Sequence, residues 1–143
     1  MSSTSSRTLE DVKVGVRCKI AALWVAMLFL FAYGDIFGFL SPGQIQEVMA
    51  GELSGMAITQ VFLFAVSLYV AVASVMVFLS LVLSPPVNRW TNIILASLYV
   101  VSIVTSAIGE TSAYYWFLSI TESALLLLIV WYAWTWPRQG GTP

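Results

Sequence analysis

Long apolar stretches alternate with short polar breaks along this chain, and the pattern occurs four times. The apolar stretches cover residues 20–40, 56–83, 90–108 and 114–136. A membrane span needs about 20 residues at 1.5 Å rise per residue to cross a hydrocarbon core of roughly 30 Å. Prolines lie only between these stretches or beyond their ends, where they do not interrupt a helix. The pattern predicts an all-α membrane protein with four transmembrane helices.

The polar breaks predict how these helices are connected. Residues 84–89 and 109–113 are short connections, which place consecutive helices side by side in an antiparallel four-helix bundle. The first break is longer, and its apolar residues recur at helical spacing. Ser41 is a suitable N-cap, Pro42 suits the first helical position, and Gly51 is a stop signal. We therefore expect a short interfacial helix between the first and second spans.

The polar ends of the chain complete the expected domain organisation. Thr8 and Asp11 have the spacing of a modest helix start, and the segment up to Lys19 reads as a juxtamembrane helix. We expect a tail with this helix over residues 1–19, a single transmembrane domain over residues 20–136, and a second tail over residues 137–143.

The composition supports the membrane assignment and excludes several function classes. Hydrophobic residues make up 59% of the chain and charged residues 9%, against roughly 45–50% and 25% in soluble proteins. The net charge of −1 offers no basic field for nucleic acid. With Cys18 as the one cysteine and no histidine, disulfide frameworks, imidazole metal sites and histidine-dependent nucleophiles are excluded. We expect no enzymatic activity, no cofactor and no metal.

The basic residues predict the orientation in the membrane. All six lie in the N-terminal segment, the second break or the C-terminal tail: Arg7, Lys13, Arg17, Lys19, Arg89 and Arg138. The opposite side carries only acids, Glu47, Glu52 and Glu110. The positive-inside rule then places both termini in the cytoplasm, for a multi-pass protein of the inner or plasma membrane. Aromatic belts are expected at the inner boundary (Trp24, Trp90, Trp131, Trp134 and Trp136) and at the outer one (Tyr114, Tyr115 and Trp116).

Two carboxylates interrupt the apolar spans and are the first candidates for function. Asp35 lies in the first span and Glu122 in the fourth, roughly 8 and 12 Å below the outer surface at 1.5 Å per residue. An acid at mid-membrane costs roughly 2.5–3.5 kcal/mol, and no basic residue lies at that depth. Such a carboxylate must be protonated, hold a cation, face water or accept several hydrogen bonds.

Polar stripes on three spans accompany these acids. The fourth span carries Tyr115, Ser119 and Glu122 on one face, the second carries Gln60, Ser67, Ala71 and Ser74, and the third carries Ser102, Thr105, Ser106 and Gly109 beside Glu110. If the stripes turn inward, they form a polar pocket that opens outward, with Asp35, Gln60, Glu110 and Glu122 around it. The same stripes are typical of interhelical packing.

Two functions follow from these alternatives. The first is a small transporter or ligand-binding membrane protein, whose acidic pocket takes a proton, a cation or an amphipathic cation. Asp35 and Glu122 would titrate, and Gln60 and Tyr115 would orient the ligand. The alternative is a non-catalytic scaffold or accessory subunit. The expected partners are the lipid bilayer, a small cationic or amphipathic ligand, and a second copy in a homodimer.

Several short motifs carry a resemblance. They are residues 33–35, 59–60, 86–94, 109–110 with 114–115, and 130–134, and together they resemble a family of small four-span prokaryotic membrane proteins. The similarity runs from about residue 9 to residue 138. That family is classed as a domain of unknown function, so the resemblance implies a fold and a habitat but no activity. A weaker architectural likeness links the chain to the DoxX-like four-helix proteins.

Overall fold

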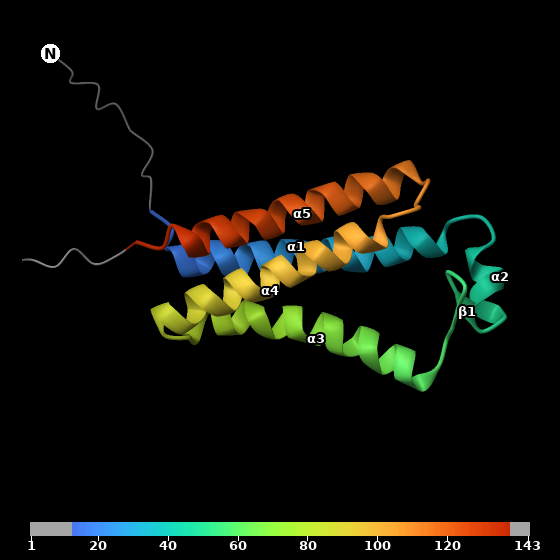
Figure 1. Ribbon diagram of the computed structural model, residues 1–143, viewed down its shortest axis with the longest axis horizontal. Helices are drawn as coiled ribbons and strands as arrows, with labels where there is room; N and C mark the ends of the chain where they lie inside the picture. Colours follow the sequence, from blue (N-terminus) through green and yellow to red (C-terminus); the bar gives the residue numbers. More distant parts are fainter. Residues whose placement is uncertain (1–12, 138–143) are drawn as a thin grey trace, which may run out of the picture.

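Four long helices lie side by side in the computed structural model, which describes residues 13–137 (Figure 1). They are α1 (Val16–Phe39), α3 (Gln60–Val82), α4 (Pro85–Ser106) and α5 (Ala113–Trp134). Each is long and apolar enough to cross a membrane. The short helix α2 (Gln44–Met49) lies between α1 and α3. The predicted four-span helical class with a short helix in the first connection is confirmed.

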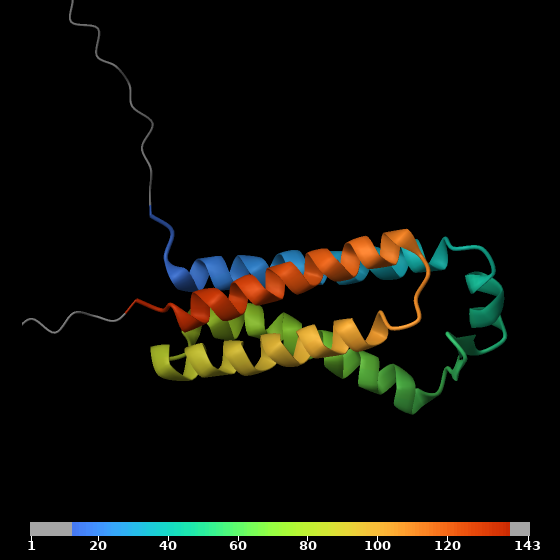
Figure 2. The ribbon, with the colours of Figure 1, turned by 45° about the horizontal axis from the view of Figure 1, so that its top comes forward.

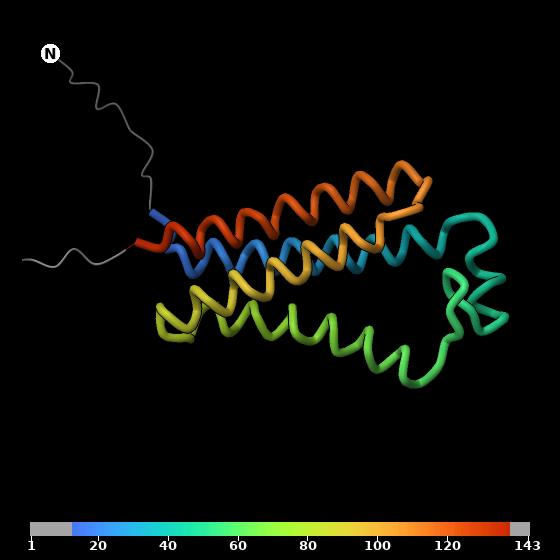
Figure 3. Tube along the Cα trace, viewed as in Figure 1, coloured from blue at the N-terminus to red at the C-terminus, as the bar shows by residue number. Residues whose placement is uncertain are grey.

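The chain reverses direction between successive long helices, which gives the molecule two distinct ends (Figure 3). One end, called the terminal end below, carries the start of α1, the end of α5 and the turn between α3 and α4. The other, called the loop end, carries α2 and the turn between α4 and α5. The two ends differ in structure, because the longest connection, which contains α2, lies at the loop end.

Helices α1 and α4 begin earlier than the predicted positions. The third apolar stretch was expected to begin at residue 90, but α4 already begins at Pro85. Proline is favoured there because the first N–H groups of a helix have no intrahelical partner. At the other end of the chain, the segment expected as a separate juxtamembrane helix contributes residues 16–19 to the first turn of α1. The helix start expected at Thr8 lies outside the described residues.

The loop end contains a small hairpin that the sequence pattern did not predict. Strands β1 (Glu52–Leu53) and β2 (Met56–Ala57) pair antiparallel around a turn in which Ser54 and Gly55 have φ of 51° and 76°. The second span therefore begins at Gln60 instead of residue 56, and the Thr59 hydroxyl caps it by accepting from the Phe62 amide at 3.1 Å.

Helix α2 also begins later than predicted. Its N-cap is Gly43, whose φ of 87° favours glycine, so Ser41 and Pro42 precede the helix. The Ser41 hydroxyl instead lies 3.3 Å from the Tyr114 hydroxyl at the start of α5. Figure 2 shows α2 and the hairpin projecting beyond the ends of the long helices.

The long helices pack unequally. Helix α1 contacts α3 and α5 along much of its length, and α5 contacts α4 in the same way, whereas α3 and α4 touch only slightly. Figure 1 shows α3 diverging from α4 toward the loop end. The largest fully buried apolar side chains are Trp24, Ile20, Met27, Met76, Leu126 and Ile129. All six belong to the halves of their helices nearer the terminal end, so the bundle is packed most tightly there.

The aromatic belt assignment is wrong for Trp24. This side chain is 0% exposed, whereas Trp90, Trp131 and Trp134 are each more than half exposed. The indole N–H of Trp24 donates to the Asn92 Oδ1 atom at 2.7 Å, so the polar edge of the ring has a partner inside the bundle. A tryptophan with an internal acceptor does not need the membrane boundary.

Basic residues at the terminal end are tied to their surroundings. The Arg17 guanidinium donates to the Leu81 carbonyl at 2.8 Å, which links α1 to the end of α3. Lys19 lies 5.3 Å from the centroid of the Tyr132 ring, and Arg89 lies 5.3 Å from that of Trp134. These cation–π contacts hold α1 and α4 against the last turns of α5.

Candidate functional site

Glu122 is a buried residue in the middle of α5. The residue is 7% exposed, as is Ser119 one turn nearer the loop end, and both lie on the same face of the helix. Within residues 13–137 nothing donates a hydrogen bond to this carboxyl, and the basic residues of that range lie at the terminal end. Glu122 is therefore a buried acid without a compensating partner.

Aromatic side chains lie at the same height in the bundle. The rings of Phe31, Tyr69 and Tyr99 form a cluster with centroid separations of 4.5–6.3 Å. Glu122 thus shares the centre of the bundle with rings from three other helices.

The two tyrosine hydroxyls of this cluster join α3 to α4. The Tyr69 hydroxyl donates to Ser102 Oγ at 2.7 Å, because the Ser102 proton is already donated to the Tyr99 carbonyl at 2.8 Å. The Tyr99 hydroxyl donates to the Tyr69 carbonyl. These bonds connect the two helices at mid-height, where their contact is otherwise slight.

Polar side chains lead from the loop end toward Glu122 along the contact of α4 and α5. The Tyr115 hydroxyl donates to Ser106 Oγ at 3.0 Å, nearest the loop end. Ser119 follows on α5, and Ser102 lies one turn below Ser106 on α4. We call Tyr115, Ser106, Ser119, Ser102 and Glu122 the polar column. It brings together the stripes predicted on the third and fourth spans.

Asp35 lies near Glu122 but in a different environment. The Cβ position of Gly34 is 3.4 Å from Leu118 Cδ1, which fixes the register of α1 on α5. Asp35 therefore lies about five residues, or roughly 7–8 Å, closer to the loop end than Glu122. Its side chain is exposed on the bundle surface, yet it is within electrostatic reach of Glu122. The two acids therefore differ in depth and in burial, because Asp35 lies at the surface nearer the loop end and Glu122 is buried.

The stripe predicted on the second span does not turn into the bundle. Gln60, Ser67, Ala71 and Ser74 are all exposed. Helix α3 instead packs through the opposite face, where Ala73, Met76 and Ser80 are buried. Gln60 lies at the first residue of α3 at the loop end, away from Glu122.

Glu110 has a local role in the turn before α5. Its Oε1 atom accepts hydrogen bonds from the Thr111 amide, the Ser112 amide and the Ser112 hydroxyl at 2.7–2.8 Å. These donors stabilise the ionised form and lower the pKa of Glu110 below its ordinary value. A carboxylate at this position also favours the positive end of the α5 dipole. Glu110 thus shapes the turn instead of lining a pocket with Glu122.

A second buried polar cluster lies toward the terminal end. Asn92 Oδ1 accepts from Trp24 and, at 3.3 Å, from the Ser80 hydroxyl, while the Asn92 amide donates to Asn88 Oδ1 at 2.6 Å. Trp24, Ser80, Asn88 and Asn92 are all 0% exposed. This cluster was not predicted from the sequence. Asn88 and Asn92 are four residues apart and therefore lie on the same face of the helix, which could have indicated a shared polar contact.

The comparisons with known proteins identify the family. The match covers residues 13–142, and its description is "Family of unknown function (DUF6326)". The chain belongs to this family. No curated protein and no solved structure matches the chain. For this DUF6326 protein, the resemblance to a four-span family of unknown function is therefore confirmed, and the function must be argued from the site itself.

Proposed function

We propose that this DUF6326 protein is a small transporter or ligand-binding membrane protein in which Glu122 binds a proton or a cation. The observation that carries the proposal is the burial of Glu122, a residue that is 7% exposed, with no hydrogen-bond donor to its carboxyl within residues 13–137. A bare charge in such a place costs several kcal/mol, so the carboxyl is most stable with a proton or a cation on it.

Access from the loop end supports this proposal. On that side the polar column supplies hydroxyl groups above Glu122, beginning with Tyr115 and Ser106. On the other side the next turns of α5 carry Leu126 and Ile129, both 0% exposed in the tightly packed core. On α5 the polar neighbours of Glu122 on its own face, Ser119 and Tyr115, therefore lie on the side of the loop end.

The surroundings of Glu122 also suggest the class of ligand. A proton needs no additional room beside a residue that is 7% exposed. An amphipathic cation would find the rings of Phe31, Tyr69 and Tyr99 beside the acid, and aromatic faces attract organic cations. Asp35, at the surface and within electrostatic reach, would hold the cation before it moves inward.

In this proposal both termini lie in the cytoplasm and the loop end faces outward across the inner or plasma membrane. The distribution of charge supports this orientation. Within residues 13–137 the basic side chains lie at the terminal end, and Glu47, Glu52 and Glu110 lie at the loop end. Basic residues are retained on the cytoplasmic side of a membrane.

A scaffold or accessory subunit is the second candidate, and one observation favours it. Many polar side chains within the spans form hydrogen bonds inside the bundle, as in the cluster of Trp24, Asn88 and Asn92. Hydroxyls elsewhere return to their own helix, as when Thr105 donates to the Val101 carbonyl. A bundle built only to present a surface to another protein would use its polar groups in this way.

Replacing Glu122 with glutamine separates the two candidates. Glu47→Gln is the matched control, since it makes the same change to an exposed acid at the loop end. Each purified variant is examined by infrared spectroscopy at acidic and basic pH, by uptake of tetraphenylphosphonium into proteoliposomes under a pH gradient, and by thermal unfolding in detergent.

We expect Glu122→Gln to remove a pH-dependent carboxylic acid band and the pH dependence of tetraphenylphosphonium binding, while the unfolding temperature stays close to that of the parent. Glu47→Gln should leave all three measurements unchanged. If Glu122→Gln lowers the unfolding temperature and leaves binding and uptake as they were, the acid is structural and the scaffold is the better account.

A further inference from the structure

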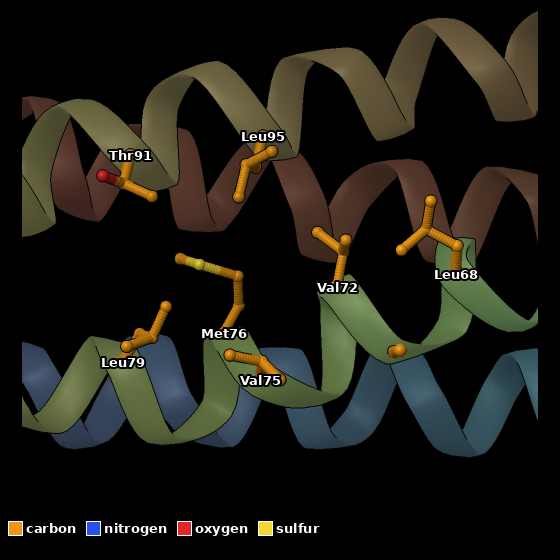
Figure 4. Close-up of a pocket in the computed structure, with 8 residues that line it drawn as sticks. Leu68, Val72, Val75, Met76, Leu79, Thr91 and Leu95 are labelled. Atoms are coloured by element: carbon orange, nitrogen blue, oxygen red, sulfur yellow. The ribbon is translucent and has the colours of Figure 1, made fainter.

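An apolar groove runs along the seam between α3 and α4. Its walls are six residues of α3 between Leu68 and Leu79, together with Thr91 and Leu95 of α4 (Figure 4). The groove exists because the two helices make few contacts with each other, so their facing side chains do not interlock. Only the Thr91 hydroxyl interrupts a wall of aliphatic and methionine side chains.

The dimensions of the groove define what fits into it. Its volume is about 320 Å³, and from Leu68 to Leu79 it extends over roughly 16 Å at 1.5 Å per residue. A groove of this length and volume accommodates a single extended hydrocarbon chain.

The position of the groove indicates where that hydrocarbon comes from. Leu79 is three residues from the end of α3 at Val82, and Leu68 lies just beyond the middle of the helix. The groove thus extends from the terminal end to about the centre of the bundle. Half of a roughly 30 Å hydrocarbon core is one leaflet, which matches this extent.

We propose that the groove is a binding site for one acyl chain of a phospholipid from the leaflet at the terminal end. The chain supplies, between α3 and α4, the van der Waals contacts that the two helices do not make with each other. This site is separate from Glu122 and does not depend on the function proposed for that residue.

A photoreactive phospholipid tests the site directly. The full-length protein is reconstituted in phosphatidylglycerol vesicles that contain a phospholipid with a diazirine on its acyl chain, and the labelled residues are mapped by mass spectrometry. Val75 and Leu79 line the groove, whereas Phe78 lies at the same depth on another face and is 63% exposed. We expect several-fold more labelling at Val75 and Leu79 than at Phe78.

Filling the groove provides the matched comparison. Ala71 lines the groove, so Ala71→Phe should abolish the excess labelling, whereas Ala65→Phe places the same ring on an exposed position of α3 outside it. Glu122→Gln should leave the labelling unchanged, so a failure of the function proposed for Glu122 would not be confused with a failure of this site.

Two results would overturn the proposal. Labelling that follows exposure, with Phe78 modified at least as strongly as Val75 and Leu79, would mean that only bulk lipid surrounds α3. Lipid adducts at Phe78 with none at Val75 or Leu79 would mean that the groove is closed to lipid because another protein surface, such as that of a second copy, covers it.

Discussion

Replacing Asn92 with leucine should weaken the bundle at the point where three helices meet. Asn92 Oδ1 accepts from the Trp24 indole of α1 at 2.7 Å and from the Ser80 hydroxyl of α3 at 3.3 Å. Leucine has a similar volume, so the substitution removes the acceptor without opening a large cavity. The Trp24 N–H then remains in a fully buried position with no partner.

The expected loss follows from these two interhelical bonds. In membrane proteins such bonds contribute on average about 0.6 and at most about 1.7 kcal/mol. A buried donor left without an acceptor adds roughly 1–3 kcal/mol. We therefore expect Asn92→Leu to lower the free energy of unfolding by about 2–4 kcal/mol.

A double-mutant cycle with Trp24→Phe isolates the bond itself. Phenylalanine has no N–H, so in the double variant no buried donor is left without an acceptor. The loss in free energy of unfolding should therefore be about 1 kcal/mol smaller in the double variant than the sum of the losses in the two single variants. The free energies come from unfolding in mixed micelles of increasing dodecyl sulfate content, followed by circular dichroism. The control cycle pairs Asn92→Leu with Trp90→Phe, a tryptophan that is 53% exposed.

The control cycle should be additive within about 0.5 kcal/mol. If the Trp24 cycle is additive to the same degree, the indole does not contact Asn92, and the placement of α4 beside α1 is wrong.

Three further predictions concern other parts of the molecule. Because the pKa of Glu110 is lowered in the folded protein, its stabilising effect is present above about pH 4.3 and is lost as the pH falls through the folded value. Hydrogen exchange of the Thr111 and Ser112 amides, corrected for intrinsic rates, should therefore accelerate at acidic pH. Glu110→Gln should remove this pH dependence, and exchange that stays pH-dependent in the variant would contradict the role of Glu110. Tyr69→Phe loses the bond to Ser102 and should lower the free energy of unfolding by about 0.5–1.5 kcal/mol in the same micelle assay, and a value near zero would show that this bond is not formed. Gly34→Ala places a methyl group at ordinary contact distance from Leu118 and should change stability by less than about 1 kcal/mol, whereas a large loss would show a closer helix approach than this register allows.

The number and class of the helices could be predicted from the sequence because apolar length is a property of the chain alone. Helix starts could not, since they depend on single capping residues such as Thr59 and Pro85. A hydropathy pattern averages over such positions, and it also misses strands of two residues such as those at 52–53 and 56–57.

The candidate site was predictable in part. Glu122 stands out as an acid within an apolar span, and Tyr115 shares its face. The direction of the α3 stripe was not predictable, because lipid and protein interior are equally apolar and hydrophobicity does not choose the buried face. Ser74 shows how a hydroxyl tolerates the outer surface, since it donates to the Val70 carbonyl of its own helix at 2.9 Å.

The unequal packing of the four helices has a consequence for the order in which the protein assembles during synthesis. Helices α1 and α3 emerge first and find each other, but α4 then meets little of α3 and depends mainly on α5. The two helical hairpins are joined largely through α1 and α5. A ribosome that stops before α5 is complete therefore releases a chain whose third span has hardly any partner. Of the four long helices, α5 is made after the other three, and it is the one that closes the bundle.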